Sequence, residues 1–261
     1  MKRLFALFTL LAFCLTLPAT AFAAGTAGAR SAARALTAAA TARTDGATVY
    51  VGGEALTGTA ESPVYATTDE NGSVLTTGAT AENYEIMWNG SILTLKDAYI
   101  ANGINDATNP INGAVIGVVS TSGNAELTIQ LEGSNTVSAS KGVHVYSSGG
   151  NASLNITGDG SLNASGSTNP GIWVQSTSGD ATLTIQNAEV TATATYFPGV
   201  TVQADDSSNA SLSVDGGSLT ATGGSSSGLG IYFYGPSSPE NINLTVSNNA
   251  IVRANGGIAS G

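Results

Sequence analysis

The sequence is poor in cysteine, in cations and in charge generally, and each shortage excludes a class of protein. Its 261 residues contain one cysteine, Cys14, so neither a disulfide framework nor a thiolate metal site is expected. The chain has 8 basic against 18 acidic residues and a formal net charge of −10, which argues against nucleic acid or an anionic membrane surface as a partner. Charged residues make up only 10% of the chain. A composition dominated by small polar residues is typical either of disorder or of a repeat.

Residues 1–23 have the features of a secretory signal peptide. A short basic start precedes an apolar run at residues 4–17, and Ala21-Phe22-Ala23 places small residues at the cleavage site. A lipoprotein signal is disfavoured, because Phe13 stands before Cys14 where a small residue is required. The protein is therefore expected to be secreted or extracellular, with no membrane insertion after cleavage of the signal.

A repeat of about 29 residues occupies positions 93–261. Each copy begins with an alternating run led by a leucine, and the intervals between these leucines are 34, 27, 29, 29 and 32 residues. The leading residues are Leu93, Leu127, Leu154, Leu183, Leu212 and Leu244. Each repeat holds three short alternating runs separated by turns rich in Gly, Asn, Asp and Ser, and none contains a helix-length apolar stripe.

Three strands per repeat predict an all-β fold, namely a parallel β-helix of about six coils, expected to be right-handed. A leucine-rich repeat would need a helical side, and a propeller blade would need four strands and a longer period. A β-sandwich also suits short strands and turn residues, but it does not explain the fixed register of the repeat.

A column of Asn and Asp supports the solenoid. An amide or carboxylate stands three residues before five of the six leading leucines, at Asn124, Asn151, Asp180, Asn209 and Asn241. Asn and Asp accept a left-handed backbone, and stacked side chains can bond from coil to coil. We therefore interpret this column as a structural ladder rather than a metal or catalytic site.

The segments outside the coils have separate roles. Residues 24–44 are Ala-rich and low in complexity, and a flexible spacer and a short capping helix both suit them. Residues 45–92 contain two hairpin signals, Gly52-Gly53 and Asn89-Gly90, and are expected to form an N-terminal β cap over the first coil. The last coil reads as incomplete, so a missing C-terminal region with a cell-wall anchor is one interpretation.

The outward face of the third strand is unusual. Elsewhere the outward positions hold Thr, Ser and Asn, whereas this face gathers aromatic, histidine and glutamine side chains. Its members are His144, Tyr146, Trp173, Gln175, Gln203, Tyr232 and Tyr234. Aromatic rings stack on sugar rings and amides bond hydroxyl groups, so the strip is a candidate ligand-binding site. Two alternatives remain open here: plain β-propensity of aromatic residues, and a face covered by a missing part of the protein or by a partner.

No catalytic residue is predicted. Asp205 and Asp206 resemble part of a polygalacturonase-like hydrolase motif, but neither the later histidine nor the basic segment of that motif follows them. The spacing indicates no Ser or Cys nucleophile for His144. A second polar column follows the first strand and holds the weak calcium candidates Asp97, Glu132, Asp159 and Asp215. No cofactor is expected, and calcium is left open.

The leader VYVGGEALTGTAESPVYATTDENGSVLTTG, the segment YEIMWNGSILTLKDAYI and the coils that follow resemble secreted β-helical repeat proteins of gut Clostridia and other Firmicutes. These are similar to a clostridial cellulose- and pectate-binding β-helix family. The resemblance rests on core and turn residues, and it implies a carbohydrate-binding or adhesive role without assigning binding residues.

The sequence therefore predicts a secreted or cell-surface, non-catalytic polysaccharide-binding or adhesive module whose partner is a polysaccharide or surface glycan. The alternatives are a polysaccharide lyase or glycoside hydrolase of the pectinase-like β-helix type, and a structural stalk that presents other domains.

Overall fold

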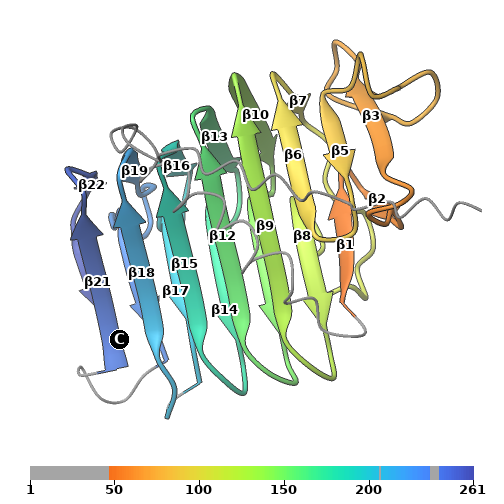
Figure 1. The fold of residues 1–261 in the computed structure, drawn as a ribbon. Coiled ribbons are helices and arrows are strands. Elements are labelled where there is room, and N and C mark those ends of the chain that lie inside the picture. Colours follow the sequence, from red (N-terminus) through yellow and green to blue (C-terminus); the bar gives the residue numbers. More distant parts are fainter. Residues whose placement is uncertain (1–46, 206, 236–240) are drawn as a thin grey trace, which may run out of the picture. The chain divides into compact units, whose positions relative to one another are not determined.

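Three parallel β-sheets, wound one after another by the same chain, build the protein (Figure 1). The computed structural model describes residues 47–205, 207–235 and 241–261. The expected signal peptide and Ala-rich segment lie outside the described residues. Within the described part the chain is all-β, and about five complete turns separate the first coil from the sixth. The predicted parallel β-helix is confirmed, while its right-handed sense stays a prediction.

Each turn of the chain adds one strand to each sheet. The first sheet contains β6 (Ile92–Lys96), β9 (Ala125–Glu132), β12 (Ala152–Gly158), β15 (Ala181–Gln186), β18 (Ala210–Asp215) and β21 (Ile242–Ser247). The second contains β7 (Tyr99–Ile100), β10 (Ser134–Ala139), β13 (Ser161–Gly166), β16 (Glu189–Ala194), β19 (Ser218–Thr222) and β22 (Ile251–Asn255). The third contains β8 (Ala114–Ser120), β11 (Lys141–Ser147), β14 (Ile172–Ser176), β17 (Val200–Gln203), β20 (Ile231–Tyr234) and β23 (Ile258–Ser260).

The core is built from columns of identical or similar apolar residues. Leu154 pairs in register with Leu127 on one side and with Leu183 on the other, as the repeat predicts. Because side chains alternate along a strand, every second residue points inward, and the leucine column is buried. Branched residues in the first and third sheets face the small alanines of the second sheet, Ala164, Ala192 and Ala221, which are fully buried. Stacking therefore gives a continuous core without cross-links.

Antiparallel strands cover the first coil. β1 (Thr48–Val51) and β2 (Glu54–Leu56) form a hairpin, and β1 pairs with β8 at the edge of the third sheet. Its turn is Gly52-Gly53 with φ of 61° and 92°, the left-handed region that this hairpin type requires. β3 (Val64–Thr68), β4 (Val74–Leu75) and β5 (Ile86–Trp88) extend the first sheet in the same antiparallel way. The predicted N-terminal β cap is therefore present.

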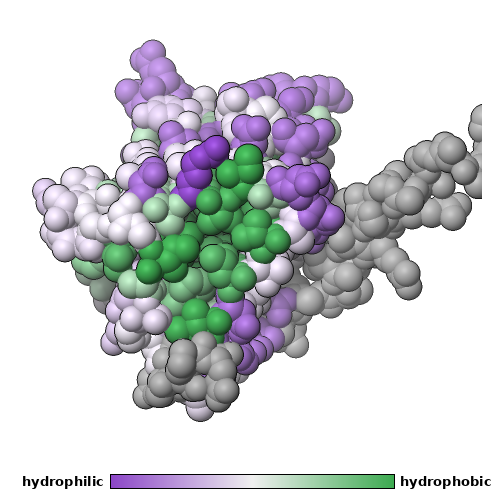
Figure 2. All heavy atoms as spheres, turned by 90° about the vertical axis from the view of Figure 1, so that its left-hand side faces the viewer, coloured by the Kyte–Doolittle hydropathy of each residue, from purple (hydrophilic) through white to green (hydrophobic). Residues whose placement is uncertain are grey.

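The opposite end of the coil stack presents apolar side chains to solvent. Figure 2 views this end and shows hydrophobic residues gathered at its centre. Leu244 and Val246 align with the buried Leu212 and Val214, yet they are 40% and 47% exposed because no further described strand lies over them. All three sheets nevertheless contain a sixth strand, of which β23 is the shortest at three residues.

The predicted Asn/Asp ladder bonds successive coils. The backbone N–H of Asn151 donates to Asn124 Oδ1 at 3.0 Å, and that of Asp180 donates to Asn151 Oδ1 at 3.0 Å. Asn209 continues the series onto Asp180 Oδ1 at 2.8 Å. The expected left-handed backbone is wrong for these residues, since positive φ at non-glycine residues falls in other turns, at Asp97, Asn187, Asn248 and Asn249. The ladder thus works through its side-chain acceptors.

Replacing Asn151 with alanine removes one such acceptor. We expect the free energy of unfolding to fall by about 1 kcal/mol, the net value of one hydrogen bond whose donor can turn to water. Urea unfolding followed by circular dichroism measures the change. Ser153→Ala is the matched control, because Ser153 lies in the same coil without a ladder bond; an equal loss in both variants would contradict the ladder.

Candidate functional site: an aromatic groove on the third sheet

The outward columns of the third sheet align as the sequence predicts. His144 pairs with Trp173, Trp173 with Thr201, and Thr201 with Tyr232. One pleat further along, Tyr146, Gln175, Gln203 and Tyr234 form the parallel column. The candidate residues therefore share one face, but the structure does not leave that face uniformly open.

A loop between β7 and β8 covers the first part of the strip. This cover loop, residues 101–113, places Ile104 and Ile111 over the sheet, where they pack with Ala114 and against Tyr50, Val119 and Tyr146. A Cβ atom at Gly117 would lie 2.5 Å from Ile111 Cδ1, so the absence of a side chain there lets the loop approach. This end of the strip is therefore covered by a loop of the chain itself, which the sequence analysis did not anticipate.

His144 is consequently buried, and its expected place in a ligand-binding surface is wrong. The side chain is 1% exposed, and its ring stacks on that of Trp173 with centroids 4.5 Å apart and planes within 6°. Nε2 lies 3.2 Å from Gln175 Oε1, while Nδ1 is buried without a partner. Burial first, and then the nearby Lys141 charge, lower the His144 pKa to about 3, so the ring is neutral at physiological pH.

Lys141 lies beside this stack and is also withdrawn from solvent. It is 7% exposed, Nζ donates to the Pro110 carbonyl at 3.4 Å, and the same atom lies 5.5 Å from the centre of a Trp173 ring. Burial lowers the pKa of the Lys141 ammonium. Cation–π attraction and the stacked histidine therefore hold the Trp173 indole in one orientation.

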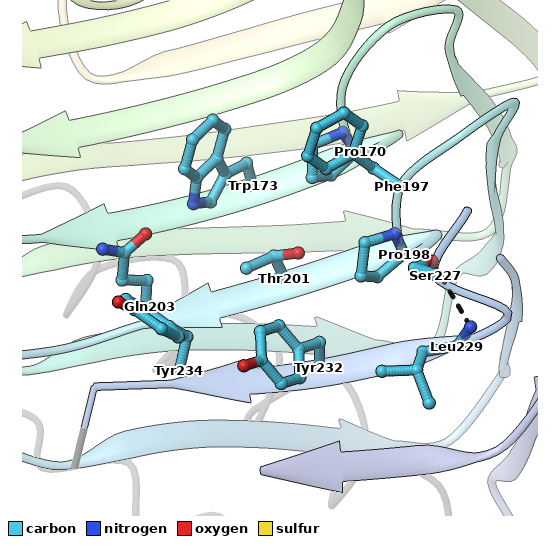
Figure 3. Close-up of a pocket in the computed structure, with 10 residues that line it drawn as sticks. All are labelled: Pro170, Trp173, Phe197, Pro198, Thr201, Gln203, Ser227, Leu229, Tyr232 and Tyr234. Atoms are coloured by element: carbon cyan, nitrogen blue, oxygen red, sulfur yellow. Dashed lines mark hydrogen bonds between the residues drawn. The ribbon is translucent and has the colours of Figure 1, made fainter. Parts of the chain in front are cut away.

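Beyond Trp173 the strip opens into a pocket of about 380 Å³. Trp173 and Tyr232 stand on strands β14 and β20, and Thr201 lies between them on β17 as a nearly buried floor (Figure 3). Gln203 and Tyr234 bound the pocket toward the strand ends. The lining is almost entirely apolar and contains no charged side chain.

The opposite wall comes from residues that the sequence analysis missed. Pro170, Phe197, Pro198 and Leu229 lie in the turns before β14, β17 and β20, on one side of the pocket in Figure 3. A signal was available, because Pro170, Pro198 and Leu229 each stand directly before the glycine that precedes β14, β17 or β20. A Cβ at that glycine would clash with the facing backbone, for example 2.6 Å from Ala192 O at Gly199, so turn and strand meet at a fixed angle.

A second, more polar pocket of about 340 Å³ continues from the first. It shares Gln203 and Tyr234 with the aromatic pocket and adds Ser176 at the end of β14, with Thr177 and Asp205 beyond the ends of β14 and β17. Gln175 belongs to neither lining, because it faces His144. The two pockets together are called the aromatic groove below.

The remaining candidates do not assemble into a reaction or metal centre in the described part. Asp97 Oδ1 accepts a bond from the Ser134 backbone at 2.8 Å, and Asp215 Oδ1 accepts one from Ser247 Oγ at 2.7 Å, so both serve turns. Glu132 and Asp159 are exposed. Among residues 47–205, 207–235 and 241–261 no group of three His, Cys, Asp or Glu side chains could hold a metal ion. Asp206 lies outside the described residues.

Comparisons with known proteins do not assign this chain to a class, so the class rests on the fold and the groove. Neither a family model, nor a curated protein, nor a solved structure matches this chain. The fold and the groove together define a β-solenoid with a lateral aromatic cleft. Within the described ranges no helix is long and apolar enough to span a membrane.

Proposed function

We propose that this protein is a non-catalytic polysaccharide-binding or adhesive module, secreted or held at the cell surface, whose partner is a glycan. The observation that carries the proposal is the open pocket with Trp173 and Tyr232 on its two sides and Gln203 at its end. Aromatic faces pack against the apolar faces of sugar rings, and the amide can bond hydroxyl groups. A concave, mostly apolar pocket with a few polar groups is the usual form of a small-ligand site.

The described residues favour binding over catalysis. His144 is sealed beneath the cover loop, and Asp205, a carboxylate of the adjoining polar pocket, accepts a bond from the Ser207 hydroxyl at 3.3 Å. A glycoside hydrolase needs two opposed carboxylates across the sugar, and the described side chains of the groove lining include one, Asp205. The lyase or hydrolase and the structural stalk remain the alternative functions, and the experiment below separates all three.

Affinity electrophoresis against a panel of soluble glycans tests the proposal. We expect at least one glycan to retard the native protein, and Trp173→Ala and Tyr232→Ala each to weaken binding about tenfold, since each removes an aromatic stacking surface. Tyr99→Ala is the matched control, because Tyr99 is an exposed aromatic residue on β7 of the second sheet.

Three results would contradict the proposal. Retardation that is unchanged in both pocket variants would place binding elsewhere, and no retardation on any glycan would favour the stalk. Release of reducing ends or unsaturated uronates during incubation would favour the enzymatic alternative.

A further inference from the structure

The aromatic groove runs along the strands rather than along the coil axis. Toward the first coils it is closed by the stack of Trp173 on His144 and by the cover loop. Along β17 it stays open from Pro198, before the strand, to Asp205, after it. At about 3.3 Å per extended residue these seven steps span at most about 23 Å, of which the strand itself gives about 10 Å, enough for a short chain of sugars.

The side chains that face the groove carry no positive charge. The cations of the described residues are Lys96, Lys141 and Arg253. Lys96 lies 5.8 Å from the Tyr84 ring in the cap, Lys141 is buried against Pro110, and Arg253 belongs to β22 of the second sheet. Among the described side chains of the lining, the charged one is Asp205.

A polyanionic ligand would therefore meet repulsion without compensation. A uronate chain filling the groove would bring its carboxylates toward Asp205, in a protein whose formal net charge is already −10. Like charges at short range disfavour binding. Lys141 contacts Trp173, but it is 7% exposed and donates to the Pro110 carbonyl, so it is withdrawn from a ligand in the groove. Uncharged sugars avoid this repulsion, and their hydroxyls can donate to the Asp205 carboxylate and to Gln203 Oε1.

We infer that the aromatic groove binds a single uncharged glycan chain lying along β17, and that it discriminates against polyuronates. The apolar pocket takes sugar faces between Trp173 and Tyr232, and the polar pocket takes hydroxyls at Gln203 and Asp205. This inference rests on the proposed function and narrows its ligand class and orientation.

Tryptophan fluorescence gives a direct assay, since the chain has two tryptophans and Trp88 is buried in the cap far along the chain from the groove. Neutral β-glucan oligosaccharides are titrated against oligogalacturonates of the same lengths. We expect the neutral series to bind more tightly as it lengthens, and the uronates to bind at least about tenfold more weakly. Trp173→Phe should abolish most of the fluorescence change.

Two pairs of matched variants test charge and direction separately. Asp205→Asn should strengthen uronate binding about fivefold with little effect on neutral chains, whereas Glu189→Gln, which removes an equal charge from β16, should change neither. Gln203→Ala should weaken neutral binding about fivefold, whereas Gln175→Ala, the same residue type one coil away and outside the groove, should not.

The outcomes separate this inference from the function on which it rests. If neither series binds while another glycan in the panel does, or if uronates bind as tightly as neutral chains, the charge argument is overturned. Equal losses in Gln203→Ala and Gln175→Ala would show a ligand running along the coil axis. If no glycan of any class binds, the proposed function itself fails.

Discussion

Replacing Ile185 with aspartate is expected to unfold the solenoid from its middle. Ile185 is fully buried on β15 and stacks in register between Ile156 and Val214. The substitution removes a packed side chain and places a carboxylate in a core without a partner, a loss of at least about 4 kcal/mol. That is comparable to the whole stability of a typical domain, about 5–15 kcal/mol. Because each coil touches only its neighbours, a broken middle coil uncouples the two halves.

The control lies one residue earlier on the same strand. Thr184 points outward, in the column of Asn155 and Ser213, so Thr184→Asp should change the free energy of unfolding by less than about 1 kcal/mol. Circular dichroism and urea unfolding of both variants measure the difference. A reversed order, with Thr184→Asp the more damaging, would show that the strand faces inward in the other register.

Strand existence could be predicted throughout, and register from the second coil onward, because every coil repeats the same packing. The predicted alignment of Leu93 with Leu127 is wrong by two residues, since Leu93 pairs with Ile129 after the longer first interval. Every coil must bury the same columns, so the alternation around Leu127, Leu154 and Leu183 has one solution that satisfies all coils together. The same turn in each coil must hydrogen-bond to the next coil, which favours Asn or Asp at the same position. The ladder could therefore be recognised in the sequence. A structural requirement that recurs in every coil leaves the same residue pattern in every repeat, so the sequence alone reveals it.

The cover loop could not be predicted, because it occurs once. The interval from Leu93 to Leu127 is 34 residues, against 27 for the next, which signals an insertion but not its path. The extra residues fold back onto the third sheet because Ile104 and Ile111 pack against it, and Gly117 has no side chain to block Ile111. That surface belongs to another strand, so the burial of His144 follows from tertiary packing alone.

The groove was predicted in part. Alternation placed Trp173, Gln203, Tyr232 and Tyr234 on one face, and these residues line the groove. It said nothing of the wall, because Pro170, Pro198 and Leu229 lie in turns where the period of two does not apply. It also treated the strip as continuous along the axis. The gap at Thr201, a small residue between two aromatic ones, is the feature that turns a strip into a pocket.

Acidification is expected to destabilise the protein through His144, the only histidine of the chain. Burial and the Lys141 charge lower its pKa from 6.5 to about 3 in the folded state, whereas the unfolded chain keeps the ordinary value. Between these two values the unfolded state binds a proton that the native state does not. Stability therefore falls as the pH drops below 6.5 and levels off near pH 3. At about 1.4 kcal/mol per pH unit, the loss from pH 7 to pH 4 is about 3 kcal/mol.

His144→Phe isolates this contribution, because a phenyl ring can keep the stack on Trp173 and has no titrating group. Urea unfolding of both proteins from pH 7 to pH 4 should show that the native chain loses about 3 kcal/mol more than the variant. Carboxylates whose pKa is lowered by local hydrogen bonds, Asp69 and Asp106, titrate equally in both and cancel in the difference. The lone histidine also gives a single set of ring proton resonances, which should not shift until the pH nears 3.

A histidine that titrates near 6.5, with parallel stability curves for the two proteins, would mean that the cover loop does not seal the ring from water. The groove would then extend past Trp173 toward the first coils, and a ligand could run along the axis after all.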